Sequence, residues 1–294
     1  MKLKLDDILI KIFLIDSISF FPNEISNKEL EILQIHDVNN FIKDCYYSSK
    51  NHKTCGNHRK HDWERGWSGD GVYYSDDERN NIPFYFKKNT HVRFDHKVYK
   101  DVGEFAELDL LQSLQFFLFK TFLPSFDSKV IIEYGFGTGS NINFLKRFFS
   151  EYSFYGAEWV DSAIEQIIKR NILPKEKVFL TNYFDENTFQ SPPEPYIMFT
   201  NASLEQCGAN YQKFMDYQIS NELCLGGIHI EPVRELLDIN EPLNKQSYDY
   251  MHRRGYLDGY LEYLKTKSIN LLLTKDYGIG SKYLSGYQSV VWKK

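Results

Sequence analysis

The sequence predicts an α/β fold built on a mostly parallel sheet, and two observations support this prediction. First, the stretch KVIIEYGFGTGSNINFL (129–145) joins a short apolar run, a glycine-rich turn and the start of an amphipathic pattern. This order is typical of a buried strand, a tight turn and a helix N-terminus, where an α/β sheet presents backbone N–H groups to a ligand. Second, strand-like and helix-like segments alternate between residues 99 and 294, as expected when helices join the parallel strands of one sheet.

The glycine-rich turn has the spacing Glu-x-Gly-x-Gly-x-Gly, formed by Glu133, Gly135, Gly137 and Gly139. The dinucleotide-binding fingerprint Gly-x-Gly-x-x-Gly would need its third glycine at position 140, which is Ser140. Alternate glycines allow the main chain to pass close to a bulky ligand. No lysine follows them to hold a phosphate, which argues against a P-loop.

This spacing resembles motif I of the class I S-adenosylmethionine (SAM) methyltransferases. Proteins of that family have a Rossmann-like, mostly parallel sheet of seven strands whose last two form an antiparallel hairpin. The resemblance implies SAM as the cofactor, held by Glu133 and the three glycines. It extends over residues 99–294, where we expect a SAM-binding methyltransferase domain. Residues 1–98 are expected to form an irregular N-terminal α+β elaboration that acts as a substrate-selecting lobe or lid.

The composition is that of a globular protein and argues against several kinds of partner. The chain has 294 residues, 26% of them charged, and a formal net charge of −5, so nucleic acid and anionic membranes are not expected partners. The apolar segment 8–15 is too short to span a bilayer and lacks a cleavage site. Four cysteines without disulfide-like spacing favour a reducing compartment, so we expect a cytoplasmic protein.

The N-terminal third carries weaker signals. In SNKELEILQ (26–34), Ser26 and Glu29 have the spacing of a capping box, which predicts the start of a helix. Further along, the stretch 61–80 interleaves aromatic residues with charges and glycines. These aromatic residues are Trp63, Trp67, Tyr73 and Tyr74. They suit stacking on a sugar ring, or alternatively a small core of the lobe itself.

The same region contains cysteines and histidines at spacings that zinc ligands can have. They are Cys45, His52, Cys55, His58 and His61. The paired Cys-x2-Cys unit is absent, and the residues lie in a stretch rich in lysine and asparagine. We therefore expect surface residues here and no metal site.

The segment 101–124 has apolar residues at three- and four-residue steps, which predicts a helix that stops at Pro124. The methyltransferase family has a helix at this place, beside the cofactor. Tyr99 and Glu104 are therefore expected either to border the SAM site or to serve as packing and surface residues. A further helix is expected at 141–150, directly after the glycine-rich turn.

Glu158 lies near the end of the second predicted strand, SFYGAEWV (153–160), 19 residues beyond Gly139. In the family, an acidic residue at this place accepts hydrogen bonds from both ribose hydroxyls of SAM. Trp159 is expected to cover the adenine. A helix at 161–174 and a third strand at 177–186 follow, and Asp185 is the candidate contact to the adenine amino group.

The fourth strand and the loop after it occupy PYIMFTNASLEQ (195–206). Asn201 and Glu205 follow its apolar run at the edge of the sheet where the reacting methyl group should lie. We expect Asn201 to contact the cofactor and Glu205 to act on the acceptor. A helix is predicted at 210–223.

The fifth strand, LCLGGIHIEPV (223–233), ends in His229 and Glu231, which share one face of the strand. A histidine or carboxylate at this edge is a candidate base for removing a proton from the acceptor, and imidazole titrates near neutrality. The alternative is a buried polar pair that holds a loop in place.

The segment 235–264 combines many hydrogen-bonding groups in one cluster. Its members are Tyr248, Tyr250, His252, Arg253, Arg254 and Tyr256. His252 is the second candidate base. The adjacent arginines either bind a phosphate of a nucleotide-linked substrate or pair with nearby acids. The segment 268–294 predicts the two terminal strands.

The signatures of DNA methyltransferases are absent, because Asn201-Ala202-Ser203-Leu204 replaces Asn-Pro-Pro-Tyr/Phe and there is no Pro-Cys nucleophile. The stretches SLEQ (203–206) and IEP (230–232), together with the segment 235–264, resemble bacterial sugar O-methyltransferases of surface-polysaccharide synthesis. We therefore expect methyl transfer to a hydroxyl of a sugar or sugar nucleotide, with no metal required.

Three alternatives stay open. The first is a methyltransferase that acts on an amine or carboxylate of another small metabolite. The second is an aminopropyltransferase, which shares the fold but needs acidic residues for a polyamine. The third is a non-catalytic SAM-binding or interaction module.

Overall fold

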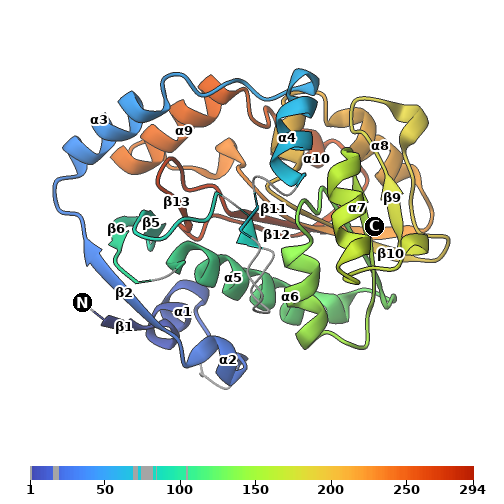
Figure 1. Cartoon of the computed structure of the whole chain (residues 1–294), viewed down its shortest axis with the longest axis horizontal. Helices are drawn as coiled ribbons and strands as arrows, with labels where there is room; N and C mark the ends of the chain where they lie inside the picture. The colour runs from blue at the N-terminus through green and yellow to red at the C-terminus, as the bar shows by residue number, and fades with distance from the viewer. Residues whose placement is uncertain (1, 16–19, 69–71, 74–81, 84, 104) are drawn as a thin grey trace.

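The computed structural model describes residues 2–15, 20–68, 72–73, 82–83, 85–103 and 105–294. Among them, the largest sheet has seven strands in the order β12-β14-β11-β10-β7-β8-β9 (Figure 1). Its parallel strands are β7 (Val130–Tyr134), β8 (Ser153–Glu158), β9 (Val178–Leu180), β10 (Tyr196–Asn201) and β11 (Cys224–Glu231). The predicted α/β fold with a mostly parallel sheet is confirmed.

The terminal strands match the expected hairpin in part. β14 (Gln288–Lys293) lies between β11 and β12 (Asn270–Lys275) and is antiparallel to both. The connection between β12 and β14 is not a simple turn, because it carries β13 (Gly280–Ser281), which pairs with a strand of another sheet.

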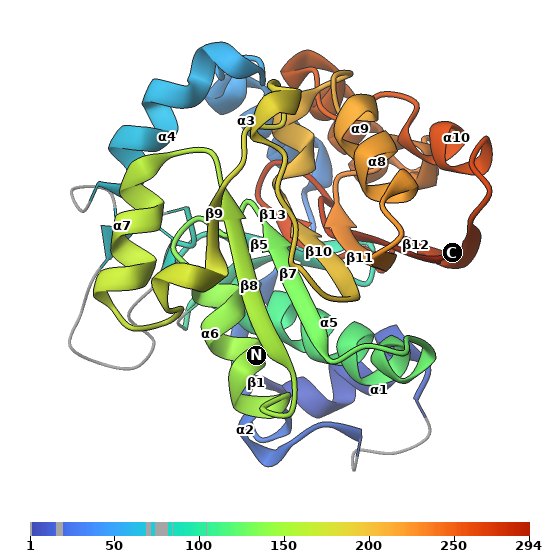
Figure 2. The same ribbon diagram turned by 90° about the vertical axis from the view of Figure 1, so that its right-hand side faces the viewer.

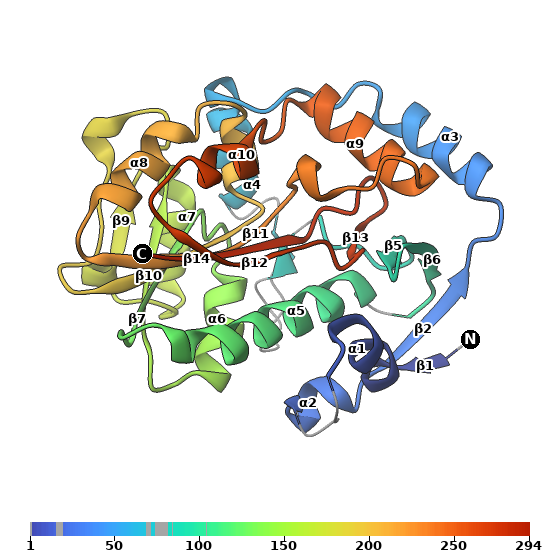
Figure 3. The same cartoon turned by 180° about the vertical axis from the view of Figure 1, so that it is seen from behind.

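Helices cover both faces of the seven-stranded sheet (Figures 2 and 3). α5 (Ala106–Phe122), α6 (Ser140–Phe148) and α7 (Asp161–Lys169) share one hydrophobic core with Ile131 of β7. α8 (Gln212–Ser220) and α10 (Tyr260–Lys265) share a second core with Ile132. Strands buried on both faces appear in a sequence as continuous apolar runs, as Val130, Ile131 and Ile132 do before Glu133.

The N-terminal residues form a second, antiparallel sheet with the order β1-β2-β6-β5-β13. Its strands from this region are β1 (Lys2–Lys4), β2 (Glu29–Gln34), β5 (His91–Phe94) and β6 (Lys97–Asp101). β3 (Val72–Tyr73) and β4 (Ile82–Pro83) form a separate pair. The strand β13 from the far end of the chain therefore completes the N-terminal sheet.

The N-terminal helices pack on elements from the rest of the chain. α1 (Leu5–Phe13) and α2 (Asn23–Ser26) contribute to the core beneath α5, where the rings of Phe13 and Phe117 stack with centroids 4.4 Å apart. α3 (Val38–Ser49) contacts α9 (Pro242–Arg254), and α4 (Lys60–Trp67) contacts α7. None of the helices in the described ranges combines the length and apolar character needed to cross a lipid bilayer.

Short 3₁₀ helices complete the described elements: η2 (Asn57–Arg59), η3 (Leu123–Ser125), η4 (Lys175–Lys177), η5 (Glu186–Thr188), η6 (Leu204–Cys207) and η7 (Arg234–Leu236). Of these, η6 directly follows β10 at the carboxyl edge of the sheet, so it sets the position of the loop that carries Glu205.

Arg93 of β5 joins the N-terminal sheet to the end of the chain. Its buried guanidinium donates hydrogen bonds to the main-chain oxygens of Leu243 (3.1 Å) and Ser281 (3.0 Å) and to Ser247 Oγ (2.9 Å). Each acceptor lies on or beside α9 or β13. A buried cation with its donors satisfied by oxygen atoms fixes the relative position of these elements.

Three predicted elements are wrong in type or extent. The third strand, expected at 177–186, is β9 (Val178–Leu180) only, because the chain turns at 182–185 and continues into η5. The helix expected at 26–34 is the strand β2, in which buried Leu30 and Ile32 alternate with Glu29 and Glu31; this two-residue period and the pairing with β1 and β6 prevail over the capping-box spacing. The helix expected from residue 101 begins at Ala106, because the chain as far as Asp101 belongs to β6.

Candidate functional site

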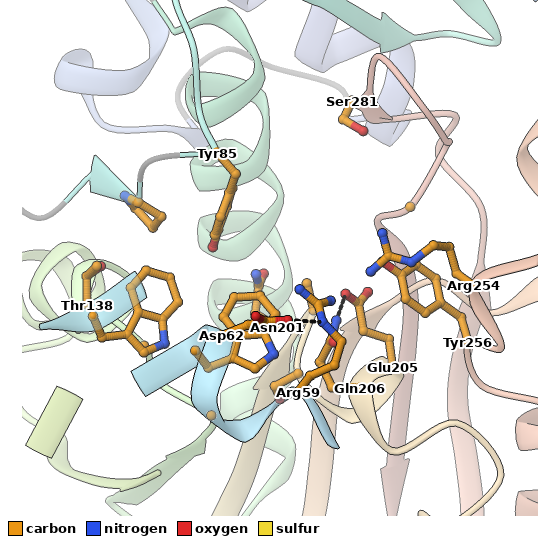
Figure 4. A pocket seen from close by; sticks show the side chains of 18 of the residues that line it. Arg59, Asp62, Tyr85, Thr138, Asn201, Glu205, Gln206, Arg254, Tyr256 and Ser281 are labelled. Atoms are coloured by element: carbon orange, nitrogen blue, oxygen red, sulfur yellow. Dashed lines mark hydrogen bonds and ion pairs between the residues drawn. The ribbon is translucent and has the colours of Figure 1, made fainter. Parts of the chain in front are cut away.

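A cavity of about 760 Å³ opens at the carboxyl ends of β7, β8 and β10 (Figure 4). Its floor is formed by the turns after these strands, with Gly135, Glu158 and Asn201 in its lining. Trp67 and Arg254 line it from the N-terminal residues and from α9. The carboxyl edge of a parallel sheet is where α/β proteins bind ligands, and the volume suits an organic ligand of moderate size.

The N–H groups of the three glycines in the turn are not free donors. Gly135, Gly137 and Gly139 all have positive φ (+78°, +54° and +76°), but their N–H groups already donate to Ala157 O, Glu158 Oε2 and Phe136 O. These three N–H groups therefore donate within the protein and not to a ligand. Gly135 and Gly137 line the cavity, whereas Gly139 packs toward Ile167 of α7.

Substitution of Gly135 by alanine is expected to destabilise the fold strongly. A Cβ atom there would lie 2.3 Å from Cβ of Ser203 in the loop after β10, at a φ of +78°. We expect a loss of about 3 kcal/mol in the free energy of unfolding. This is the sum of the cost of the left-handed conformation for alanine and the cost of the steric overlap with Ser203. Gly259→Ala is the matched control, because Gly259 has a φ of +68° but a Cβ atom added to it would meet no other atom within 4 Å.

The two variants separate these contributions when their unfolding by urea is compared. Gly259→Ala should lose about 1 kcal/mol, the conformational cost alone. Equal losses in the two variants would contradict the close packing of the β10 loop on Gly135.

Glu158 lies at the end of β8 and faces the glycine-rich turn. Its carboxylate accepts hydrogen bonds from the N–H groups of Gly137 (3.0 Å) and Trp159 (2.8 Å). Burial raises the pKa of Glu158 to about 7. Trp159 lines the cavity beside it, as does Thr181. Thr181 Oγ1 is buried and has no hydrogen-bond partner within the described chain.

Helix α4 covers the glycine-rich turn from above. Its Trp67 places a ring carbon 3.2 Å from the position of a Cβ on Gly137, and Trp63 stacks on Trp67 with centroids 5.6 Å apart. Glu64 holds the helix to the start of α7 through hydrogen bonds from Ser162 N and Oγ, both 2.9 Å. Both tryptophans line the cavity, and Trp67 also belongs to the hydrophobic core. Tyr74 and the side chain of Tyr73 lie outside the described residues.

A buried polar network positions the asparagines beside the turn. Gln115 Nε2 donates to Asn141 Oδ1 (2.8 Å) and Asn201 Oδ1 (3.3 Å), and Asn141 Nδ2 donates to Glu133 Oε1 (2.7 Å). Asn141 and Asn201 line the cavity; Glu133 does not, and burial raises its pKa to about 8. Sequence analysis missed Gln115 and Asn141, although Gln115 interrupts the apolar face of α5 as a fully buried amide.

The two predicted glutamates come together at the loop after β10. Glu231 accepts hydrogen bonds from the N–H groups of Ser203 (3.0 Å), Leu204 (3.1 Å) and Glu205 (3.2 Å), and it does not line the cavity. Glu205 lines the cavity and accepts a hydrogen bond from Gln206 Nε2 (2.7 Å). Burial and then the charge of Glu231 hold the pKa of Glu205 well above its ordinary range.

The two predicted histidines lie away from the cavity lining. His229 is fully buried in the sheet; Trp292 Nε1 donates to its Nε2 (2.8 Å), so its Nδ1–H faces Thr200 Oγ1 (2.8 Å). Burial lowers the pKa of His229 to about 3. His252 lies in the last turn of α9, is exposed and contacts Arg234 (3.0 Å). This geometry gives His229 a role in the sheet interior and leaves neither imidazole facing a ligand in the cavity.

His229 is expected to make the fold sensitive to acid. Its pKa is about 3 in the folded chain, below the ordinary value of 6.5, so between these values only the unfolded chain takes up a proton and stability falls as the pH falls. From pH 7 to pH 5, the free energy of unfolding should drop by about 2 kcal/mol more in the wild type than in His229→Gln. Urea unfolding at both pH values measures this difference; identical pH dependence in the two proteins would contradict it.

Asp185 and Tyr99 also lie outside the cavity lining. Asp185 caps η5 by accepting a hydrogen bond from Asn187 N (3.1 Å). Tyr99 is buried and stacks on Phe94 with centroids 4.1 Å apart. Glu104 lies outside the described residues.

The cysteines and histidines of the N-terminal third do not gather at one place. Cys45 Sγ donates to Lys282 O (3.2 Å), and Cys55 Sγ donates to Gly255 O (2.8 Å). Within the described ranges, no group of three or more His, Cys, Asp or Glu side chains has an arrangement that could hold a metal ion.

No protein-family model matches the chain, and no curated protein matches its sequence. A SAM-dependent methyltransferase from Anabaena variabilis is similar in structure at 14% identity, with 80% of this chain and 92% of that chain covered and a TM-score of 0.47. Magnesium protoporphyrin IX methyltransferase from Synechocystis, solved with bound SAM, is 8% identical over 64% of this chain and 82% of that chain, with a TM-score of 0.42. The plantazolicin methyltransferase BpumL is 14% identical over 63% and 84%, with a TM-score of 0.42. Identities this low leave the function to be inferred from the cavity.

Proposed function

We propose that this chain is an enzyme that binds SAM and transfers its methyl group to a hydroxyl of a sugar or sugar nucleotide. The observation that carries the proposal is Glu158: a buried carboxylate at the end of β8, in the lining of the cavity and opposite the glycine-rich turn. A carboxylate so placed can accept hydrogen bonds from the two hydroxyls of a ribose. The position of β14 between β11 and β12 supports the same family resemblance.

The residues present fit SAM as a cofactor. Gly135 and Gly137 place the main chain of the turn in the cavity lining, where a bulky ligand can approach it closely. Glu158 would hold the ribose. Trp159 would lie by the adenine, together with the Thr181 hydroxyl, which has no hydrogen-bond partner among the described residues. Asn141 and Asn201, fixed by Gln115, would contact the amino-acid end. When bound, SAM supplies a methyl group that its sulfonium makes electrophilic.

Glu205 is the best placed of the four predicted catalytic residues. It alone among them lines the cavity, while Glu231 holds the loop that carries it. Its raised pKa makes the ionised carboxylate a stronger base than an ordinary glutamate, which suits removal of a proton from an acceptor hydroxyl. We assign Glu205 as the general base and Glu231 as the residue that positions it.

The cavity lining also suits a polar, ring-shaped acceptor. Tyr85 and Tyr256 offer ring faces, and Asp62 and Gln206 offer hydrogen-bonding groups (Figure 4). Trp63 also lines the cavity. Stacking combined with hydrogen bonding is the usual way to bind a sugar. We propose that the lobe formed by residues 1–98 selects this acceptor, and that the acceptor belongs to surface-polysaccharide synthesis.

Calorimetric titration with SAM and, separately, with NAD tests the cofactor. We expect SAM to bind with a Kd of the order of micromolar, about −8 kcal/mol, and NAD to give no heat of binding. Incubation with methyl-labelled SAM and a panel of sugar nucleotides then tests the acceptor. Absence of SAM binding would refute the proposal at its first step, whereas SAM binding without transfer to any sugar would refute the acceptor class alone.

A further inference from the structure

Arg254 differs from the other cations that line the cavity. Within the described part of the chain, it is the buried one, with 9% of its surface exposed, whereas the remaining lysines and arginines of the lining are half-buried or exposed. The half-buried Arg59 is paired with Asp62, and Lys282 is paired with Asp44. Burial of a cation costs free energy that a solvated cation does not lose, so a buried cation needs a compensating interaction.

Arg254 has no carboxylate partner among the described residues. Its Nη1 donates to Tyr250 Oη (3.1 Å), its Nε has no hydrogen-bond partner, and its guanidinium lies over the rings of Tyr250 and Tyr256 at 5.8 and 5.1 Å from their centroids. Ring faces and the C-terminal end of α9 favour a cation, but each does so more weakly than an anion in direct contact. The buried Nε–H of Arg254 therefore has no acceptor among the described residues.

The neighbours of Arg254 in the cavity lining include His52 and Glu205. His52 Nδ1 lies 3.1 Å from Tyr250 Oη, the same hydroxyl oxygen that accepts a hydrogen bond from Arg254 Nη1. The pKa of His52 is lowered by burial and by three arginines, Arg254 first. Glu205 is the acid of the lining that Arg254 faces in Figure 4, and the two side chains form no ion pair.

We propose that Arg254 is an anion subsite, which binds a phosphate or carboxylate group that the acceptor carries beside the atom presented to Glu205. Tetrahedral and planar oxyanions both match the fork of an arginine side chain. The inference rests on the proposed function, because only that function makes the anion a part of the methyl acceptor. Anion binding at Arg254 can nevertheless be tested without methyl transfer. The inference narrows the substrate class to acidic or phosphorylated molecules.

Arg253 provides a matched control one residue away. Its Nη2 donates to Ser49 Oγ (3.1 Å) and its guanidinium lies over the ring of Tyr46 on α3, outside the cavity lining. Substitution of Arg253 removes the same charge from the same turn of α9 and leaves the cavity unchanged. The two adjacent arginines of the sequence thus have different roles.

The first experiment follows the arginine Nε–H signals of the ¹⁵N-labelled full chain, with the Arg254 signal assigned by its loss in Arg254→Lys. Inorganic phosphate, acetate and glucose serve as probes. We expect phosphate or acetate to shift the Arg254 signal saturably, at a concentration about tenfold lower than is needed to shift the exposed Arg147 signal, because a buried guanidinium gains more from an oxyanion. Glucose should leave it in place.

The second experiment measures the rise in the thermal unfolding midpoint that phosphate produces, since a ligand that binds the folded chain stabilises it. The rise should persist in Arg253→Gln and be lost in Arg254→Gln. If Arg254→Gln does not fold, the response of the Arg254 Nε–H signal to phosphate in the wild-type chain still tests the subsite.

The outcomes distinguish a phosphate from a carboxylate as the anion, and they distinguish failure of the subsite from failure of the proposed methyl transfer. A response to phosphate alone assigns a phosphorylated or nucleotide-linked acceptor, and a response to acetate as well assigns a carboxylate such as that of an acidic sugar. An Arg254 signal that neither oxyanion shifts overturns the subsite. If SAM does not bind in the same sample, the proposed methyl transfer is refuted. A saturable shift of the Arg254 signal in that sample would still support the anion subsite.

Discussion

Replacement of Glu205 by glutamine is expected to lower the rate of methyl transfer by about 10²–10⁴-fold, the usual contribution of a general base. Glutamine keeps the shape of the side chain and can still contact Gln206, but it cannot accept the proton of a hydroxyl. SAM affinity should change little, because Glu158 and the glycine-rich turn, rather than Glu205, would hold the cofactor. Single-turnover kinetics with labelled SAM measures the step directly.

The pH profile gives a second readout of the same residue. Since Glu205 must be ionised to act as a base, the wild-type rate should rise with pH through the raised pKa of this carboxyl and fall as the pH decreases below it. The glutamine variant should lose this rise. Glu186→Gln is the matched control, because Glu186 is exposed and pairs only with Lys213 among the described residues. A rate for Glu205→Gln within about threefold of the wild type would refute the assignment of the base.

Glu158→Ala is expected to weaken SAM binding by at least about 100-fold. The loss of two hydrogen bonds from a ribose to a charged acceptor corresponds to roughly 3–6 kcal/mol. The substitution also removes the acceptor of the Gly137 and Trp159 N–H groups, so part of the loss would come from a loosened turn. Calorimetry with SAM measures the affinity, and circular dichroism of the same sample shows whether the fold is kept.

Two further variants divide these contributions. Glu158→Gln keeps one acceptor oxygen for the turn and should bind SAM with intermediate affinity. Glu165→Ala removes an exposed glutamate from α7, the next helix, and should bind SAM as the wild type does. Unchanged SAM affinity in Glu158→Ala would exclude the ribose contact.

The sequence was most informative where function depends on local spacing. The glycine-rich turn and Glu158 belong to one strand–helix–strand unit, so a short stretch of sequence determines both their conformations and their distance from each other. The network of Gln115, Asn141 and Asn201 joins three separate elements, and Arg254 reaches the cavity from a helix that the strand pattern does not place. Long-range contacts of this kind leave no periodic signal.

His229 illustrates a different limit of sequence analysis. Alternation along the fifth strand correctly placed His229 and Glu231 on one face of the strand. Ile228 and Ile230 lie on the opposite face, in the core that also contains α5, α6 and α7. The alternation did not give the depth of His229 and Glu231: β11 ends at Glu231, so Glu231 reaches the loop at the edge of the sheet while His229, two residues earlier, pairs with Val290 in its interior. A shift of two residues along a strand, about 7 Å, separates an interior position from an edge position.

The completion of the N-terminal sheet by β13 has a consequence for the synthesis of the protein. Arg93 and Ser281, which are joined by a hydrogen bond, are 188 residues apart in the chain. During translation, β5 therefore emerges from the ribosome long before its partner exists, and its outer edge stays unpaired for that time. Because an unpaired strand edge readily adds strands from other molecules, the nascent chain is more prone to aggregate than the finished protein. Chaperone demand should accordingly fall once residues 280–281 have been made and docked.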